Sequence, residues 1–196
     1  MTEKEKMEKQ LLYDANFDEE LRRERILAKE LCFDFNALHP SDEKRQHEIM
    51  KRLLGKTTGV FSILAPFWCD YGYNIEIGNN FFANHNTVIL DGGKVTFGDN
   101  VFIAPNCGFY TAGHPIDFER RNAGLEYAYP IAVGDNVWIG GGVQVMPGVT
   151  IGSNVVIGGG SIVIKDIPDN SVAAGNPCRV IRKITEKDKK TFCQNT

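Results

Sequence analysis

The sequence predicts a mainly β protein in which short parallel strands wind into a triangular coil, with a helical segment before it and a basic segment after it. Three observations predict this fold. Apolar residues recur every six positions in the middle of the chain, most of the 20 glycines lie between residues 55 and 175, and residues 1–54 contain no glycine. A period of six matches neither an α-helix, whose apolar face recurs near 3.6 residues, nor a plain strand, whose faces alternate.

Length and charge narrow the functional classes. The chain has 196 residues, which fits one domain with an extension. Its net charge of -3 comes from 22 basic and 25 acidic side chains, a balance that argues against nucleic acid as a partner. No apolar run approaches the roughly 20 residues that span a bilayer, and residues 1–10 are charged. We therefore expect no membrane partner and a cytoplasmic location.

Residues 1–56 form the first of three expected parts, a helical segment. Leu27, Leu31 and Phe35 follow one another at helical spacing. Pro40 then halts that helix, and Ser41 is a residue type that caps the start of another. The sequence predicts two or three helices here.

The six-residue repeat occupies most of residues 57–178, the second expected part. Reading in sixes from Val133 gives VGDNVW, IGGGVQ, VMPGVT, IGSNVV, IGGGSI and VIKDIP, and the same pattern begins upstream at Ile77 and again at Phe97. The first residue of every six is apolar, and the fifth is mostly small or β-branched. These lead residues are Ile77, Ala83, Ile89, Phe97, Ile103, Phe109, Val133, Ile139, Val145, Ile151, Ile157 and Val163.

Such a period marks a corner that returns every six residues. Three short strands joined by tight turns then make one coil of a parallel β-helix, and successive coils stack about 4.8 Å apart. Each lead side chain points into the prism, and glycine or asparagine beside it suits a corner that needs positive φ or close packing. The sixes predict about four coils, and spacing alone does not fix their handedness.

One long interruption breaks the repeat, between residues 111 and 130. This excursion loop reads TAGHPIDFERRNAGLEYAYP, and His114 lies near its start between Gly113 and Pro115. Loops of this length in compact domains usually serve a function, so the loop is where we expect chemistry.

These motifs carry a specific resemblance. The stretches NIEIGNNFFAN, GDNVFIAPN, TAGHPI, GDNVWIGGGVQVMPGVTIG and DNSVAAGNPCRVIRKI, together with LLYDAN near the start, resemble the maltose and galactoside O-acetyltransferases of the hexapeptide-repeat family. The resemblance covers nearly the whole chain. It implies a left-handed parallel β-helix with an N-terminal helical segment and a C-terminal helix. It further implies a homotrimer with acetyl-CoA sites between neighbouring subunits.

His114 is the expected catalytic base. Moving an acetyl group from a thioester to a hydroxyl needs a group that takes the hydroxyl proton, and a histidine pKa near about 6.5 suits that task at neutral pH. The resemblance implies this role for the histidine of TAGHPI, with direct attack on acetyl-CoA and no covalent enzyme intermediate. From position alone, a loop histidine that only satisfies hydrogen bonds is the alternative.

The acceptor side needs carboxylates and amides that bind hydroxyl groups. The resemblance assigns Asp14, Asn84 and Asp91 to this site. Asp70 joins them as a weaker candidate, because relatives often carry serine there. Each of these side chains could instead cap a turn or helix.

The cofactor side needs cations for the phosphates of coenzyme A and a smooth groove for its pantetheine arm. The resemblance implies that Arg179 and Arg182 bind the phosphates and adenine, within the basic residues 179–196 that form the third part. It also places Gly141, Gly159 and Ile164 along the cofactor groove. Trp138 is expected to flank the active site. A solvated basic helix is the alternative for residues 179–196.

The sequence thus predicts an acetyl-CoA-dependent O-acetyltransferase acting on a maltose-, glucose- or galactoside-like sugar. A xenobiotic or antibiotic alcohol as acceptor is the alternative. No metal is expected, since zinc would need three protein ligands and only His85 and His114 lie in the repeat region. An ice-binding or scaffold solenoid is disfavoured because Thr87, Thr96 and Thr150 form no regular ladder.

Overall fold

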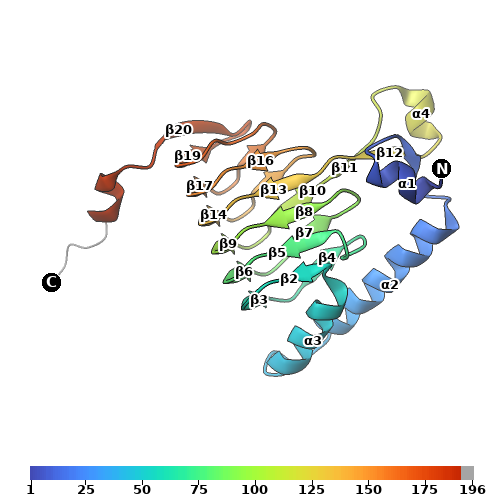
Figure 1. Ribbon diagram of the computed structural model, residues 1–196, viewed down its shortest axis with the longest axis horizontal. Helices are drawn as coiled ribbons and strands as arrows, with labels where there is room; N and C mark the ends of the chain where they lie inside the picture. Colours follow the sequence, from blue (N-terminus) through green and yellow to red (C-terminus); the bar gives the residue numbers. More distant parts are fainter. Residues whose placement is uncertain (191–196) are drawn as a thin grey trace.

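The computed structural model describes residues 1–190, and the chain there is a stack of β coils with helices at one end (Figure 1). Three helices come first: α1 (Glu3–Glu8), α2 (Glu19–Asn36) and α3 (Glu43–Leu53). The first of these is capped at Thr2, whose hydroxyl accepts the Glu5 amide while the Glu5 carboxylate accepts the Thr2 amide. Three helices agree with the two or three predicted.

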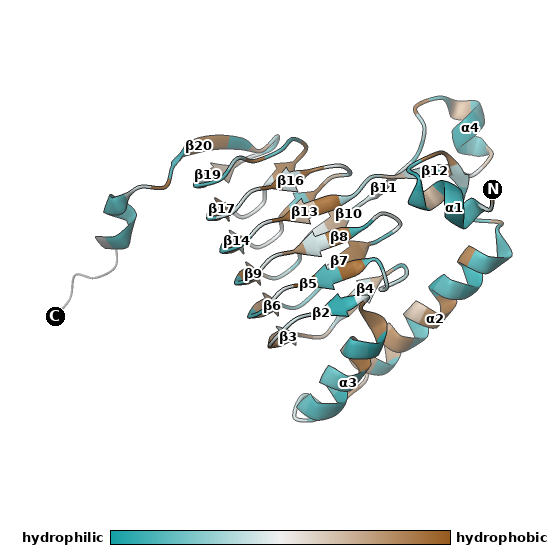
Figure 2. Ribbon diagram, viewed as in Figure 1, coloured by the Kyte–Doolittle hydropathy of each residue, from teal (hydrophilic) through white to brown (hydrophobic). Residues whose placement is uncertain are grey.

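Helices α2 and α3 cover the first coil through their apolar faces. Cys32 and Phe35 of α2 are buried in the same core as Met50 of α3, and the apolar stripe of both helices is visible in Figure 2. The predicted cap at Ser41 was wrong by one residue. The side chain of Asp42 instead accepts the amide of Arg45, so Asp42 is the N-cap of α3.

Three sheets of parallel strands form the sides of the prism. The first contains β2 (Lys56–Thr57), β5 (Ile75–Ile77), β8 (Val95–Phe97), β13 (Ile131–Val133) and β16 (Thr150–Ile151). The second contains β3 (Phe61–Ile63), β6 (Phe81–Ala83), β9 (Val101–Ile103), β14 (Val137–Ile139), β17 (Val155–Ile157) and β19 (Ser171–Ala174). The third contains β4 (Phe67–Cys69), β7 (Thr87–Leu90), β10 (Gly108–Tyr110), β15 (Gln144–Val145) and β18 (Ile162–Val163). The chain visits the three sheets in turn, as the period of six predicts.

The number of coils exceeds the prediction of about four. Each of two sheets has 5 strands, and β19 adds a further, incomplete coil to the remaining sheet. The additional coils lie at the two ends. Thr57, Ile63 and Cys69 keep the six-residue spacing in the first coil but begin with a polar residue, and a four-residue step from Val163 to Ile167 shifts the register before the last coil. Helices α2 and α3 pack on the first coil, and β20 pairs with β19 at the other end.

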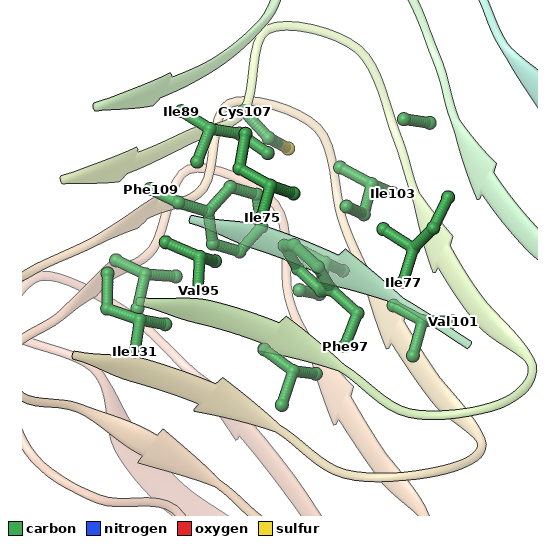
Figure 3. Close-up of a cluster of buried hydrophobic side chains, with 14 of the residues drawn as sticks. Ile75, Ile77, Ile89, Val95, Phe97, Val101, Ile103, Cys107, Phe109 and Ile131 are labelled. Carbon is green, nitrogen blue, oxygen red and sulfur yellow. The ribbon is translucent and has the colours of Figure 1, made fainter. Parts of the chain in front are cut away.

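The lead residues form the core of the prism. All of them are at most 4% exposed, and Figure 3 shows several packed across the interior. Phe97 and Phe109 meet edge to face with ring centroids 5.0 Å apart. Ser161, a small residue at a fifth position, is also buried and donates its hydroxyl to the Gly158 carbonyl. The predicted inward direction of the first and fifth positions is confirmed.

Two different positions in each six explain the glycines and asparagines of the corners. Beside the lead residue, coils approach so closely that a Cβ on Gly98 would lie 2.8 Å from the Gly134 carbonyl carbon. Two residues later the backbone is left-handed, as at Asn100 with φ of 57°. Asn100 accepts a side-chain hydrogen bond from Asn80 and donates one to Asn136, which ties three coils together.

The excursion loop leaves the stack and returns with secondary structure of its own. It contains β11 (Ala112–Gly113), α4 (Phe118–Asn122) and β12 (Leu125–Ala128), which lie together with α1 in Figure 1. Strand β12 pairs antiparallel with β11 on one side and with β1 (Tyr13–Asp14) on the other. The N-terminal segment therefore contacts the loop that carries His114.

The end of the described chain forms an arm beyond the stack (Figure 1). Strand β20 (Arg179–Lys183) pairs antiparallel with β19, and a short 3-10 helix, η1 (Glu186–Lys190), follows. The predicted C-terminal helix is therefore short, and Arg179 and Arg182 lie on the strand before it. Residues 191–196 of the predicted basic segment lie outside the described residues.

Candidate active site

The small antiparallel sheet determines where His114 lies. Gly113 pairs with Tyr127, so the next residues in that register, His114 and Glu126, face each other. Glu126 in turn pairs with Tyr13 of β1. Cross-strand neighbours project to the same face of a sheet, so one row carries an imidazole, a carboxyl group and a phenol.

The His114 ring is oriented by the backbone. Its Nδ1 lies 3.0 Å from the Leu125 carbonyl oxygen, which only accepts hydrogen bonds, so Nδ1 carries the proton. The lone pair of the neutral ring is then on Nε2, and 47% of the side chain is exposed. An oriented, accessible Nε2 is the arrangement that a general base needs.

Glu126 lies on the Nε2 side of this ring. Its Oε1 is 3.8 Å from Nε2, and its side chain is 19% exposed. Burial raises the pKa of Glu126 above its ordinary value, and the nearby His114 opposes that shift. The sequence analysis did not single out Glu126, because only the pairing of β11 with β12 brings it to His114.

Asp91 is a buried carboxylate in the same region. Its Oδ1 accepts the backbone amides of Asp70 at 3.0 Å and Tyr71 at 2.8 Å. Within residues 1–190, Oδ2 has no hydrogen-bond partner, although Asp91 has no exposed surface. Burial raises the pKa of Asp91 to about 6. An unpartnered polar atom in this position suggests a role other than folding stability.

Helix α2 supplies the cation that faces these acids. Arg25 donates one hydrogen bond to the Tyr71 hydroxyl at 2.6 Å and another to the Ala15 carbonyl. Burial raises the pKa of Asp70, and Arg25 opposes that shift. The charges of Asp70 and Arg25 also act on Glu126. The structure thus brings Asp70 and Asp91 into one cluster with the His114 row, and Arg25 is a second residue that the sequence analysis missed.

The other two predicted acceptor residues hold local turns. The Oδ1 of Asp14 accepts the amides of Asn16 and Phe17 directly after β1. Asn84 follows β6 at a corner of the prism, where its Oδ1 accepts the His85 amide at 2.8 Å. The backbone of Asp14 lies beside Leu125 in the small sheet, so this residue borders the excursion loop. Substrate contacts for Asp14 and Asn84 stay predictions.

A row of outward-facing side chains runs along the second sheet toward the C-terminal arm. Strand register aligns Trp138 with Val156, Val156 with Val172, and Val172 with Arg182. A groove of about 880 Å³ is lined by these residues and by η1. The row begins at the side chain of Trp138, which is 55% exposed. It continues over the two valines and ends at the guanidinium of Arg182.

The remaining predicted cofactor positions lie on neighbouring corners. Gly159 lies one coil beyond Gly141, and the Gly141 carbonyl accepts the Gly160 amide at 2.8 Å. Ile164 follows β18 and is 47% exposed. At these positions backbone groups and an exposed aliphatic surface line the corners.

The two arginines differ in what they contact. Arg179 donates to the Cys178 carbonyl, whereas Arg182 forms a two-pronged pair with Asp188 at 2.7 and 2.9 Å. This pair lowers the pKa of Asp188 to about 2. Arg182 is therefore held in place over the groove by a residue that the sequence analysis did not weigh.

Relatives of this chain identify its class. A protein of Saccharomyces cerevisiae, YJL218W, provisionally named an acetyltransferase, is 63% identical over 180 residues, which cover 92% of each chain. The family model described as "maltose acetyltransferase hexapeptide capping motif" matches residues 6–59, and the model "bacterial transferase hexapeptide (six repeats)" matches residues 130–165. The chain belongs to the hexapeptide-repeat acetyltransferases.

Solved structures agree with this assignment. The acetyltransferase superposes on a maltose O-acetyltransferase from Clostridium difficile 630 with a TM-score of 0.93 and 53% identity, covering 95% of this chain and 99% of the other. A galactoside acetyltransferase in complex with coenzyme A gives a TM-score of 0.94 and 45% identity, covering 98% and 96%. The expected left-handed parallel β-helix and the expected acetyltransferase class are confirmed.

Two further features of the acetyltransferase bear on its partners. Among residues 1–190, no three His, Cys, Asp or Glu side chains gather in a way that could hold a metal ion. None of the helices within that same range is sufficiently long and apolar to cross a membrane.

Cys32, Cys69, Cys107 and Cys178 are buried free thiols, and Cys193 lies outside the described residues.

Proposed function

We propose that this acetyltransferase moves the acetyl group of acetyl-CoA directly to a hydroxyl of a sugar, with His114 as the general base. One observation supports this most strongly. The Nδ1 of His114 donates to the Leu125 carbonyl, which leaves Nε2 as an oriented and exposed base. The similar galactoside acetyltransferase is in complex with coenzyme A, and a 36% identical Vibrio cholerae acetyltransferase with acetyl-CoA, which supports the choice of donor.

The proposed reaction needs one group that accepts a proton, and His114 is that group. As the acceptor oxygen attacks the thioester carbonyl, Nε2 of His114 takes the hydroxyl proton. The tetrahedral intermediate then collapses, the carbon–sulfur bond breaks, and the imidazolium returns the proton to the departing thiolate. The products are an acetyl ester and free CoA, and no bond to the protein forms.

The acceptor side of the proposal uses Asp70 and Asp91, with Asp14 and Asn84 as further contacts. Carboxylates accept hydrogen bonds from hydroxyl groups, so a cluster of acidic side chains beside the base favours a polyhydroxylated acceptor. Asp91 itself has no exposed surface, so a hydroxyl would reach its unpartnered Oδ2 only after its neighbours move aside.

The donor side of the proposal uses the row that ends at the arginines. Pantetheine would follow the exposed corners, and the phosphates would meet the cations of the arm. The proposed contacts are Trp138, Gly141, Gly159, Ile164, Arg179 and Arg182. We further propose a homotrimer with active sites between subunits and a cytoplasmic location. No metal cofactor takes part in the proposed reaction.

The proposal is tested by steady-state release of free CoA from acetyl-CoA with a panel of acceptors. Maltose, glucose and a methyl galactoside represent sugars, and chloramphenicol represents a xenobiotic alcohol. We expect release that depends on a sugar, with an acetylated sugar as the second product. Release only with the xenobiotic would contradict the sugar assignment, and acetyl-CoA binding without transfer to any acceptor would contradict the transferase reaction.

A further inference from the structure

The side chains of Glu126 and His114 lie next to each other in the small sheet, Glu126 on its central strand β12 and His114 directly after the neighbouring strand β11. Their nearest atoms, Oε1 and Nε2, are 3.8 Å apart, which is longer than a direct hydrogen bond. Glu126 is the less exposed of the two, at 19% against 47%. The base therefore has a carboxylate beside its reactive nitrogen.

The carboxylate is not needed to orient the imidazole. In a Ser-His-Asp triad, the acid binds the histidine nitrogen that is remote from the nucleophile. Here the Leu125 carbonyl already holds that nitrogen, Nδ1, at 3.0 Å. Glu126 lies on the other side, where the acceptor hydroxyl must approach Nε2.

Neighbouring strands hold the backbone of Glu126 in place. Its strand, β12, is hydrogen-bonded to β1 and β11 on its two sides. Tyr13, its partner in the strand register, is 1% exposed, and its phenol slightly opposes the rise in the pKa of Glu126. A carboxylate fixed in this way has little freedom to turn toward bulk solvent.

We infer that Nε2 of His114 and Oε1 of Glu126 together bind a pair of neighbouring hydroxyl groups on the acceptor. One hydroxyl gives its proton to Nε2 as it attacks, and the other donates a hydrogen bond to the carboxylate. Two acceptor atoms 3.8 Å apart suit two donor oxygens on adjacent carbons. This inference rests on the proposed function and narrows the acceptor to polyols with adjacent hydroxyl groups.

The pair also affects the charge that develops during the reaction. When His114 takes the proton, its ring becomes positive beside an ionised carboxylate, which favours the charged form. The other charges that act on Glu126 are those of Asp70 and Arg25, which oppose each other. A monohydroxy alcohol would gain this charge effect but not the second hydrogen bond, so the two contributions can be separated.

The test compares cyclohexane-1,2-diol with cyclohexanol, which differ by one hydroxyl group. In the native protein we expect kcat/KM for acetyl transfer to favour the diol by about 10-fold to 100-fold, mainly through KM. Glu126→Leu, which has no oxygen to accept the second hydroxyl, should remove most of that preference. Glu119→Leu, at an exposed acid on α4 of the same loop, is the matched control and should leave the preference unchanged.

Equilibrium binding provides a second readout that does not require turnover. We would titrate each alcohol into the protein with coenzyme A present and follow the His114 ring signals by nuclear magnetic resonance. The native protein should bind the diol more tightly than cyclohexanol by about 10-fold to 100-fold, and Glu126→Leu should bind both alike.

The outcomes separate this inference from the proposed function. Selective binding of the diol without acetyl transfer would support the pair and contradict the proposed reaction. Acetyl transfer with no diol preference in the native protein would overturn the pair, as would a preference that survives in Glu126→Leu. A loss of diol and cyclohexanol activity by the same factor in Glu126→Leu would also overturn it, because the charge effect would then be the whole role.

Discussion

The backbone amide of Asp70 donates to Oδ1 of Asp91 at 3.0 Å. The carboxylate of Asp91, which has no exposed surface, is thereby held against the backbone of a second acidic residue. Within the described chain, Oδ2 of Asp91 is left without a hydrogen-bond partner. An ionised carboxylate in this condition destabilises a fold, because the two backbone hydrogen bonds to Oδ1 offset its desolvation only in part. The environment of the Asp91 carboxylate therefore fits a role in ligand binding.

Asp91 should make the stability of the protein fall as pH rises toward neutrality. Its pKa is about 6 in the folded state and 3.8 in the unfolded reference, so the folded state holds a proton that the unfolded state lacks between these values. The contribution is fully present below about pH 4 and is lost as pH rises through about 6, amounting to about 3 kcal/mol. Urea unfolding at pH 4.5, 6 and 8 measures it.

Asp91→Asn is the matched variant for that measurement. It keeps an oxygen for the two amides but removes the titration, so the native protein should lose more stability than the variant between pH 4.5 and 8. Acceptor-dependent activity should fall in the variant at every pH, because the carboxylate would no longer bind the acceptor. Parallel stability curves for the two proteins would contradict this account.

Arg182→Ala should weaken the binding of acetyl-CoA. Arg182 ends the groove that begins at Trp138, and a lost charge-assisted contact to a phosphate corresponds to about a 10-fold to 100-fold rise in KM for acetyl-CoA. The KM for the acceptor should change little. Lys183→Ala, on the adjacent residue of β20, serves as control, and an equal effect in both variants would show that only general positive charge matters.

Asn100 should contribute to stability both through its backbone and through its side chain. Asn100→Ala loses the hydrogen bonds with Asn80 and Asn136 and places alanine at a φ of 57°, so we expect a loss of about 2 kcal/mol. Asn100→Gly loses the same bonds without that backbone cost and should lose about 1 kcal/mol. Thermal and urea unfolding measure both, and equal losses would argue against the backbone contribution.

The six-residue repeat was predictable because the side chain at the first position of each six is buried. Every lead residue from Ile77 to Val163 is buried, since each points into the same prism, and the six-residue spacing records this directly. The number of coils was not predictable in the same way. The first and last coils keep the six-residue spacing only over short runs, from Thr57 to Cys69 and from Ile167 to Ala173, and shifts of register separate both runs from the long repeat.

The site was predictable only in part. A chemical argument and a sequence resemblance led to His114, Asp70 and Asp91, and the structure brings these three residues into one region. Glu126 was missed because antiparallel pairing of residues 112–113 with residues 125–128 brings it to His114, and this pairing lies in the excursion loop, outside the six-residue repeat. Arg25 was missed because a charged residue on a helix looks like solvent-exposed surface until its contacts with Tyr71 and Ala15 are known.

The most direct test of the account is CoA release by His114→Ala, compared with the native protein at matched folding and matched acetyl-CoA binding. We predict that sugar-dependent release falls by a factor of about 10² to 10⁴, the range for loss of a general base. Thermal unfolding and acetyl-CoA affinity should stay unchanged, since among residues 1–190 the exposed ring makes a single hydrogen bond, to the Leu125 carbonyl. Native-like release by His114→Ala would contradict the assignment of His114 as the base.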